Sequence, residues 1–556
     1  MNINEINSLV ELFFKRLSKI NNKKKFLKWL NPKNNYQYNW KEVSEKIYKL
    51  SKEIKNLIKE GDRCLLLSEN RPEWLMADIA IMNAGGISVP IFTTYVEDDY
   101  EYIIKDCSPS LIIVSNDDQF KKINKFIVNK KIISMEKIDS KSITFEEIFK
   151  HEVEKKINNN LKRNMPACII YTSGTSGQPK GVVLSHGGIL SNCEGAIELL
   201  EPLIEKKKTI FLTWLPLSHS YEHTVQFIQI LIGAEIYYAE SLEKLIPNMQ
   251  DAKPTIMTAV PRFYQNLFTK INMNLKKQTG LKKKLIDQTL ILGKKILEKN
   301  NLNLKENIIN FLCENLVRKK IKKQFGGNLK AFISGGGALE QNIGEFLNAI
   351  GLPTLQGYGL TEASPVVSCN LPDLVKVDTV GPAFRTNKIK IADDGEILVK
   401  GENIMLGYWG QKEETDKVIK DGWLYTGDIG EMDLNGYLKI TDRKKDIIVN
   451  LGGDNISPSK IENILCLNEY VKQAFVYGDK KNYLVGILVT EKLENENKIK
   501  KVLENTNKNL NLIERVKKIV VIDKEFTIEN RMLTPTLKLK RKEIIKNYKH
   551  KLDKLY

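Results

Sequence analysis

Between residues 60 and 115 the sequence alternates short apolar runs with a segment of helical pattern. The runs CLLLS at 64–68, ISVPIF at 87–92 and LIIV at 111–114 have the length and composition of buried strands. A helix is predicted around Glu73–Asn83, between the first two runs. Strands that alternate with helices usually pair in the same direction, with the helices covering the sheet. The sequence therefore predicts an α/β fold.

A different pattern occupies the segment from Thr269 to Gln324. It is helical in period, dense in Lys and contains few residues that break helices apart from Gly280 and Gly293. This pattern predicts an inserted pair or trio of helices at about 269–325.

The last third of the chain changes character twice. From about residue 387 the period becomes that of β-hairpins, with an Asp-Gly turn at 394–395. The charged stretch DRKKD at 442–446 then precedes a segment of mixed αβ pattern. We therefore expect a large first domain at 1–442 and a small second domain at 443–556.

Length and composition restrict the class of protein. With 556 residues, of which 42% are apolar, the chain can form two to four domains with sizeable cores. No apolar run reaches the roughly 18 residues that a membrane span needs, and Glu5 and Glu11 interrupt any signal peptide. Seven scattered Cys residues without a C-x-x-C pair predict neither a disulfide framework nor a zinc site. We expect a cytoplasmic protein.

The net charge of +18 has two interpretations. It could serve an acidic partner, namely nucleic acid, anionic lipid or a polyanionic substrate. Because Lys and Asn are frequent throughout the chain, a general compositional bias is the favoured interpretation. The first twenty residues raise a similar choice, since apolar residues at helical spacing accompany Lys15, Arg16 and Lys19. Packing of this helix onto the protein's own core is favoured over contact with a membrane surface.

The stretch YTSGTSGQPKGVVLSH at 171–186 lies between two apolar runs and predicts a turn between strands. Its glycines let the backbone approach a ligand closely, while its hydroxyls and Lys180 add hydrogen-bond donors and a positive charge. This chemistry suits a polyphosphate. The spacing is not that of the common G-x-x-x-x-G-K-[ST] loop, so a different nucleotide-binding architecture is implied. Composition alone leaves a flexible Gly/Ser surface loop as the alternative.

Two other reaction classes find little support. His219 and His223 stand at H-x-x-x-H spacing, but the order is not H-E-x-x-H and no third ligand is evident, so a metal site there is not predicted. The sequence also lacks G-x-S-x-G, which leaves serine hydrolase chemistry without support.

Six polar, glycine-bearing segments follow one another in an informative order. They are YTSGTSGQPKG (171–181), LPLSHSYEH (215–223), QGYGLTE (356–362), DGWLYTGD (421–428), TDRKKDIIVNLGGDNISPSKIE (441–462) and LTPTLKLKR (533–541). In this order the chain resembles the adenylate-forming superfamily over nearly its whole length. The LPLSH and LTPTLKLKR motifs, VPRFYQNLF at 260–268 and the Lys-rich insertion resemble the long-chain fatty acid branch.

The resemblance implies a fold and a reaction. The fold is a large N-terminal domain of doubly wound sheets plus a distorted β-barrel, followed by a small mobile α+β C-terminal domain. In the reaction, a long-chain fatty acid and ATP give acyl-AMP and pyrophosphate, and the thiol of coenzyme A then takes the acyl group. ATP, Mg²⁺ and coenzyme A are the implied cofactors.

The resemblance also gives roles to residues that match its motifs. Glu362 would bind Mg²⁺, because a hard cation prefers carboxylate oxygen, and Thr361 would donate to the α-phosphate. His219 would line the acyl pocket, and Asp428 would accept from the ribose hydroxyls with help from Arg443. The residues expected to bind ATP or AMP are Thr172, Ser173, Gly174, Thr175, Ser176, Gly177, Lys180, Gly335, Gly336, Gly337, Gln356, Gly357, Tyr358, Gly359, Thr361, Asp428 and Arg443.

The catalytic Lys of the superfamily has two matches near the C-terminus. The K-x-x-R spacing selects Lys538 with Arg541 and leaves Lys540 as the competitor. The resemblance further implies a hinge at Lys445, where many relatives have Asp, and a coenzyme A channel near Gly452 and Gly453.

The acceptor and the partners stay open. An acyl-AMP ligase that loads a carrier protein shares the first step, and a catalytically silent, basic lipid- or nucleic-acid-binding protein could share the fold. We expect no nucleic acid partner. A peripheral contact with an anionic membrane would give the basic surface a use, and a homodimer is compatible with the sequence.

Overall fold

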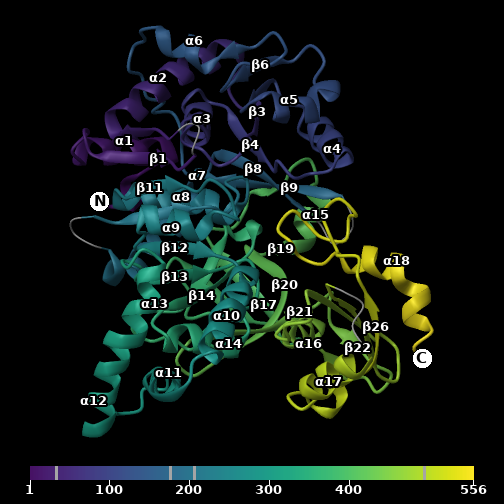
Figure 1. Cartoon of the computed structure of the whole chain (residues 1–556). Coiled ribbons are helices and arrows are strands. Elements are labelled where there is room, and N and C mark those ends of the chain that lie inside the picture. The colour runs from purple at the N-terminus through teal and green to yellow at the C-terminus, as the bar shows by residue number, and fades with distance from the viewer. Residues whose placement is uncertain (32–34, 174–177, 205–207, 492–495) are drawn as a thin grey trace.

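The computed structural model describes residues 1–31, 35–173, 178–204, 208–491 and 496–556, with only the backbone of Ser173 and Glu496 (Figure 1). One eight-stranded sheet has the order β18-β9-β8-β4-β3-β5-β6-β7. Its strands are Arg63–Leu67 (β3), Ile87–Ile91 (β4), Leu111–Val114 (β5), Lys131–Ser134 (β6), Ile143–Thr144 (β7), Pro166–Ser173 (β8), Pro179–Ser185 (β9) and Gly407–Tyr408 (β18).

The predicted strands and helix of residues 60–115 are confirmed. β3, β4 and β5 pair in parallel, and α3 (Pro72–Asn83) connects the first two. All twelve residues of α3 are buried, because the helix is apolar on nearly every side and lies inside the protein. The other helices of this region are Trp40–Leu57 (α2), Glu97–Cys107 (α4), Asp117–Ile123 (α5) and Phe145–Lys150 (α6).

A second eight-stranded sheet has the order β15-β14-β13-β12-β10-β11-β1-β2. Helices α7 and α8 lie between the two large sheets in Figure 1 and are buried along most of their length. The elements are Lys25–Trp29 (β1), Gln37–Asn39 (β2), His186–Leu200 (α7), Ile210–Thr213 (β10), Ser220–Ile232 (α8), Glu235–Tyr238 (β11), Leu245–Ala252 (α9), Ile256–Ala259 (β12), Ala331–Ser334 (β13), Gln341–Ala349 (α14), Thr354–Gly359 (β14) and Val366–Cys369 (β15).

The segment with the dense Lys pattern is helical. After β12 the chain forms α10 (Pro261–Lys276), α11 (Gly280–Leu297), α12 (Leu304–Cys313), a π-helical turn (Glu314–Arg318) and α13 (Lys319–Gln324). The bottom left of Figure 1 shows α11 and α12 as an arm, with α12 at its outer end.

A five-stranded sheet follows in the region with the hairpin period. Its path is β16-β17-β20-β19, with β21 beside β20, and the Asp-Gly turn joins β16 to β17 as predicted. The elements are Asn387–Ile391 (β16), Glu396–Gly401 (β17), Lys412–Val418 (α15), Ile419–Lys420 (β19), Trp423–Met432 (β20) and Leu438–Arg443 (β21).

The C-terminal segment has the predicted αβ character. Three strands form a sheet in the order β24-β25-β26. Its apolar side chains belong to two separate clusters, one packed with α16 and the other with α18. The elements are Ile448–Val449 (β22), Asn455–Ile456 (β23), Pro458–Leu465 (α16), Gln473–Tyr477 (β24), Leu484–Val489 (β25), Glu496–Asn507 (α17), Val516–Ile522 (β26) and Arg541–Asp553 (α18).

The N-terminal helix packs onto the core, as favoured from the sequence. It runs from Leu9 to Lys19 (α1) and buries five apolar residues, among them Phe13 and Phe14. Arg163 holds the segment before it, because its guanidinium donates to the carbonyls of Ile3 (3.1 Å) and Ile6 (2.8 Å).

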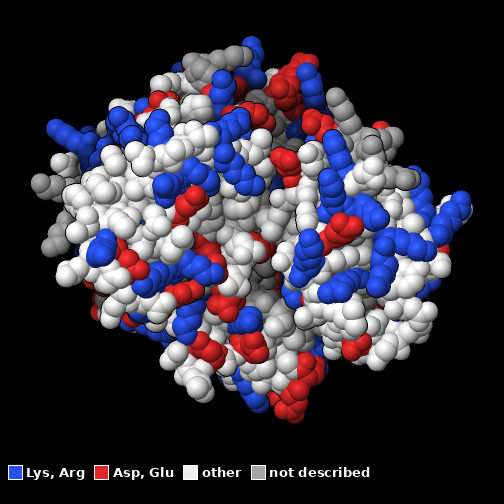
Figure 2. Space-filling model, turned by 60° about the horizontal axis from the view of Figure 1, so that its bottom comes forward, with Lys and Arg blue, Asp and Glu red and all other residues white. Residues whose placement is uncertain are grey.

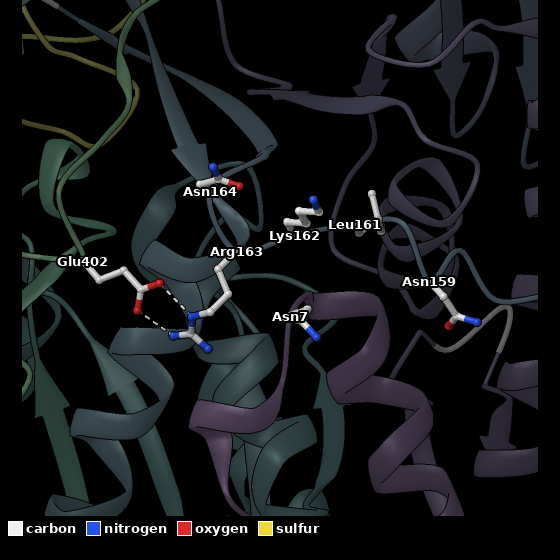
Figure 3. Close-up of a pocket in the computed structure, with 7 residues that line it drawn as sticks. All are labelled: Asn7, Asn159, Leu161, Lys162, Arg163, Asn164 and Glu402. Atoms are coloured by element: carbon white, nitrogen blue, oxygen red, sulfur yellow. Dashed lines mark hydrogen bonds and ion pairs between the residues drawn. The ribbon is translucent and has the colours of Figure 1, made fainter.

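Arg163 also pairs with both carboxylate oxygens of Glu402, at 2.6 and 2.7 Å, in an open hollow (Figure 3). The hollow is lined by Asn7, Asn159, Leu161, Lys162, Arg163, Asn164 and Glu402. None of these residues belongs to the six motifs, so we interpret the hollow as a structural junction. Within the described residues, no helix is both long enough and apolar enough to cross a bilayer.

Candidate active site

The loop motif at 171–181 connects β8 and β9. The two strands are antiparallel, with Thr172 opposite Lys180, so the prediction that strands flank this motif is confirmed. Four residues of the predicted phosphate loop lie outside the described residues: Gly174, Thr175, Ser176 and Gly177.

Lys180 is held by partners that are distant in sequence. Its ammonium donates to Glu414 Oε2 at 2.6 Å and lies 4.9 Å from the ring centroid of Tyr408. Hydrogen bonds from Lys180 and Lys417 lower the pKa of the Glu414 carboxyl to about 2. Glu414 therefore neutralises and positions the charge that the sequence predicts for phosphate.

The QGYGLTE motif covers β14 and a short 3₁₀ turn, Thr361–Ala363. Gly359 is required there, because a Cβ would lie 2.0 Å from the carbonyl oxygen of Pro365. Glu362 is half-buried, and its Oε1 accepts a hydrogen bond of 3.0 Å from the hydroxyl of Tyr408. The same Tyr408 thus contacts the predicted metal ligand and the predicted phosphate-binding Lys180.

The start of α8 lies beside this turn. The hydroxyls of Ser220 and Thr361 are 3.0 Å apart, and His219 caps the helix by accepting from the backbone N–H of Tyr221 at 3.2 Å. Burial, together with the positive charge of Lys538, lowers the pKa of His219 to about 4. His219 is therefore neutral at pH 7 and can offer hydrogen bonds without adding charge.

The predicted glycine wall follows β13. A Cβ on Gly335 would lie 2.9 Å from the ring of Tyr221, and Gly336 has a φ of +81°, which favours glycine. The side-chain oxygen of Gln356 accepts from Leu339 N at 3.1 Å and fixes the far end of this turn.

In the neighbouring strand β14, a Cβ on Gly357 would lie 3.2 Å from the carbonyl oxygen of Ser368. The backbones of β14 and β15 therefore approach each other closely here. Gly337 has more room, since its nearest neighbour would be 3.5 Å away. The wall is therefore a surface of backbone, as adenine stacking would need.

Asp428 is buried and lies at the centre of a polar cluster. Tyr358 donates its hydroxyl to Asp428 Oδ2 at 2.7 Å, and Arg443 Nε donates to Oδ1 at 3.0 Å. Asp428 and Arg443 are direct partners in the β20–β21 register. The register therefore fixes the carboxylate and guanidinium opposite one another.

The C-terminal domain brings Lys538 to this cluster. The residue as a whole is exposed, whereas its ammonium is surrounded by protein groups, and the charges of Arg443, Asp428 and Glu362 all act on it. Burial of the ammonium among protein groups and repulsion from Arg443 lower the pKa of Lys538 to about 8. A small loop carries it, in which the Lys538 N–H donates to Thr534 Oγ1 at 3.0 Å.

Lys540 points to a different place. Burial raises the pKa of Asp99 in α4, and the charges of Lys540 and Arg531 oppose that rise. Arg531 also forms an ion pair with the neighbouring Asp98. We call this arrangement the α4 clamp: the ion pair of Arg531 with Asp98, and the charge of Lys540 acting on Asp99. They join the two ends of the Lys538 loop to the large domain.

The remaining predicted residues lie apart from the cluster. Lys445 is exposed in the turn after β21. Gly452 and Gly453 are exposed in the turn between β22 and β23, where Gly453 has a φ of +83°. Arg541 does not face the site, since it forms a bidentate pair with the buried Glu462 at 2.6 and 2.9 Å.

His223 has a structural role in the core. It is fully buried, and its Nε2 lies 3.0 Å from Asp78 Oδ2 in α3. This pair joins two buried helices. Six of the seven Cys residues are buried and all are free, as the sequence predicts.

Comparison with known proteins decides the family. Residues 14–409 match the model described as AMP-binding enzyme, and residues 445–556 match the AMP-binding enzyme C-terminal domain. The chain belongs to the AMP-binding enzyme family.

Curated relatives of this AMP-binding enzyme are similar over most of their length. Long-chain-fatty-acid–CoA ligase 5 of Rattus norvegicus is 31% identical, with 88% of this chain and 79% of that protein covered. Long-chain-fatty-acid–CoA ligase FadD15 of Mycobacterium bovis is 27% identical, with 90% and 88% covered. Long chain acyl-CoA synthetase 3 of Arabidopsis thaliana is 28% identical, with 93% and 86% covered.

Solved structures share the fold. An anthranilate CoA ligase, AuaEII, in complex with anthranoyl-AMP has a TM-score of 0.77 at 19% identity, with 98% of this chain and 99% of that chain covered. An o-succinylbenzoate CoA synthetase from Bacillus subtilis with its acyl-adenylate intermediate has a TM-score of 0.73 at 20% identity, with 96% and 97% covered. The predicted adenylate-forming fold, with a large N-terminal and a small C-terminal domain, is confirmed.

The AMP-binding enzyme has residues that suit ATP and Mg²⁺. Among the described residues, no group of three or more His, Cys, Asp and Glu could hold a metal. Mg²⁺ bound with a nucleotide needs fewer protein ligands, since one or two carboxylates and the phosphates complete its shell. Glu362 offers one such carboxylate near the cluster, with Tyr408 on only one of its oxygens. The donor set therefore fits a metal that arrives with ATP.

Proposed function

We propose that this AMP-binding enzyme is an ATP-dependent long-chain fatty acid–CoA ligase. In the first step a carboxylate oxygen attacks the α-phosphorus of ATP, the bond to the bridging oxygen breaks, and pyrophosphate leaves. In the second step the thiol of coenzyme A attacks the carbonyl carbon of acyl-AMP, and AMP leaves. The observation that carries this proposal is the meeting of Lys538 with Glu362, Asp428 and Arg443 in one cluster.

The first step requires charge neutralisation, because a carboxylate is repelled by a polyphosphate. We assign this role to the ammonium groups of Lys538 and Lys180, with Mg²⁺ held through Glu362 supplying a further positive charge. Asp428 would hold the ribose hydroxyls, since its carboxylate is already oriented by Tyr358 and Arg443. Thr361 would donate to the α-phosphate, and neutral His219 would orient the fatty acid carboxylate.

The second step needs room for the thiol. We propose that the C-terminal domain turns about Lys445, withdraws Lys538 and presents the turn of Gly452 and Gly453 to a coenzyme A channel. The exposed positions of these three residues leave them free to change environment.

The first test compares substrates. Thioester formation should be fastest with coenzyme A and with acids of about twelve carbons or more, because each buried CH₂ contributes up to about 0.8 kcal/mol of binding. The measurement is product formation over chain lengths from acetate to oleate, with either coenzyme A or an acyl carrier protein as acceptor. A preference for acetate or an aromatic acid would reject the long-chain assignment. Transfer to the carrier protein alone would make the enzyme an acyl-AMP ligase.

A second test uses the pKa of Lys538. This pKa is lowered to about 8, so the ammonium is present below that pH and is lost above it. ATP–pyrophosphate exchange should therefore fall as the pH rises through about 8, and Lys538→Arg should move that fall to higher pH. An exchange rate of Lys538→Arg that falls at the same pH as wild type would show that another group controls the profile.

We also propose that the enzyme acts at a membrane surface, where long-chain fatty acids partition. A homodimer stays compatible with this proposal, and measurement of the mass in solution would decide the oligomeric state.

A further inference from the structure

The positive charge of the chain is concentrated in the helical arm. Residues 269–325 contain fifteen Lys and Arg but only four Asp and Glu, a net charge of +11 out of the +18 of the whole chain. A uniform compositional bias would spread the charge over all 556 residues. The arm is therefore a basic surface in its own right, and composition alone does not account for it.

Helix α12 also presents an apolar face to solvent. Four large apolar side chains of α12 and one of the π-helical turn that follows it are exposed. The four in α12 recur at i, i+4, i+7 and i+8, which places them on one side of the helix. Their exposed fractions are 84% for Leu304, 66% for Ile308, 69% for Phe311, 43% for Leu312 and 48% for Leu316. We call these five residues the α12 stripe. Its orientation is opposite to the usual one, because α12 buries only Cys313.

The arm also carries lysines without an ion-pair partner among the described residues. Lys282, Lys284, Lys299, Lys305 and Lys320 are exposed and form no ion pair within the described part of the chain. Figure 1 places α12 at the outer end of the arm, and Figure 2, in which the bottom of that view comes forward, shows Lys and Arg spread widely over the surface. An apolar strip among unpaired cations at a projecting end is suited to an amphipathic, negatively charged surface.

Three kinds of occupant can be compared by their chemistry. A second copy of the arm would bring two surfaces of net charge +11 together, which repel one another. Nucleic acid would neutralise the charge but would not cover the five exposed apolar side chains. An anionic bilayer satisfies both features, because acyl chains receive the stripe while headgroups attract the lysines. We propose that the α12 stripe docks this enzyme on anionic lipid bilayers.

This inference rests on the proposed function and adds to it the part of the molecule that contacts the membrane. Helix α10, which leads into the arm, begins at Pro261, whose ring lies against Gly337 of the predicted adenine wall. Docking through α12 therefore holds the site, through α10 and α11, close to the phase in which long-chain fatty acids dissolve.

The experiment measures binding of the full-length protein to vesicles by flotation. Vesicles contain phosphatidylcholine alone or phosphatidylcholine with phosphatidylglycerol. We expect binding only to the anionic vesicles, with a loss of about tenfold or more for Ile308→Asp/Phe311→Asp. Lys299→Glu/Lys305→Glu should also weaken binding, by about fivefold or more for each charge near the surface. Leu434→Asp is the matched control, because this fully exposed apolar residue lies in the β20–β21 turn, and it should bind as wild type.

Each outcome has a defined meaning. Absence of wild-type binding to anionic vesicles, or equal binding by Ile308→Asp/Phe311→Asp, would overturn the proposal. A wild-type dimer that dissociates in this variant would instead assign the stripe to a second copy. ATP–pyrophosphate exchange with an acid of about twelve carbons, supplied in solution without vesicles, should be unchanged in all variants. Its loss in wild type would count against the proposed function and leave the vesicle result intact.

Discussion

Glu362→Ala should lower ATP–pyrophosphate exchange by about 10³-fold or more. A bound metal contributes several kcal/mol of stabilisation to transferring phosphoryl groups, and each 1.4 kcal/mol or so corresponds to about a factor of ten in rate. In the structure, Glu362 is the half-buried carboxylate that shares Tyr408 with Lys180, so its removal takes away the proposed protein ligand of Mg²⁺. The measurement is fatty-acid-dependent exchange at saturating Mg²⁺.

The control for this variant is Glu413→Ala. Glu413 is an exposed glutamate in α15, next to the Glu414 that binds Lys180, and it should exchange at the wild-type rate. Fatty acid binding, followed by a fluorescent analogue, should survive in Glu362→Ala. Normal exchange in this variant would place the metal elsewhere.

Lys538→Ala should separate the two half-reactions. Loss of one preorganised charge typically lowers a rate by about 10²–10³, so the adenylation rate should fall by that amount. Thioester formation from synthetic acyl-AMP and coenzyme A should stay close to wild type, because the proposed mechanism has the domain turned away from the site in that step. Both rates are measured on the same protein preparation.

Lys540→Ala is the matched comparison. Its ammonium acts on Asp99 at the α4 clamp, and exposed ion pairs contribute about 0–1 kcal/mol, so adenylation should fall no more than about fivefold. If Lys540→Ala loses adenylation and Lys538→Ala keeps it, the assignment of the catalytic Lys is wrong. If Lys538→Ala impairs both half-reactions equally, a fixed C-terminal domain becomes the better description.

Local sequence patterns were sufficient to predict the strands of the sheet that holds the phosphate-loop motif. The apolar runs at 64–68, 87–92 and 111–114 became β3, β4 and β5 within about one residue, because strands buried on both faces are apolar throughout. The two strands around 171–181, β8 and β9, were equally evident, since Gly and Ser residues separate two such runs.

The side chains that contact the predicted site residues could not be predicted from the neighbouring sequence. Tyr408 lies 46 residues after Glu362, and Glu414 lies 234 residues after Lys180. Such pairs depend on how distant elements pack, here β18 and α15 against β9. The sequence likewise predicts the helices of the arm but cannot show that α12 turns its apolar side outward, since periodicity defines a face without giving its direction.

The α4 clamp sets how readily the enzyme changes form. One surface ion pair, Arg531 with Asp98, and the charge of Lys540 near Asp99 link the Lys538 loop to α4, and mobile ions screen such interactions over a Debye length of about 10 Å at 0.1 M salt. The clamp therefore acts as an electrostatic catch of low strength, which ions loosen before any buried contact has to break. If the C-terminal domain turns as proposed, ionic strength becomes a means of shifting the enzyme between its nucleotide-activating and thiol-accepting forms, without any change to the residues proposed to carry out the chemistry.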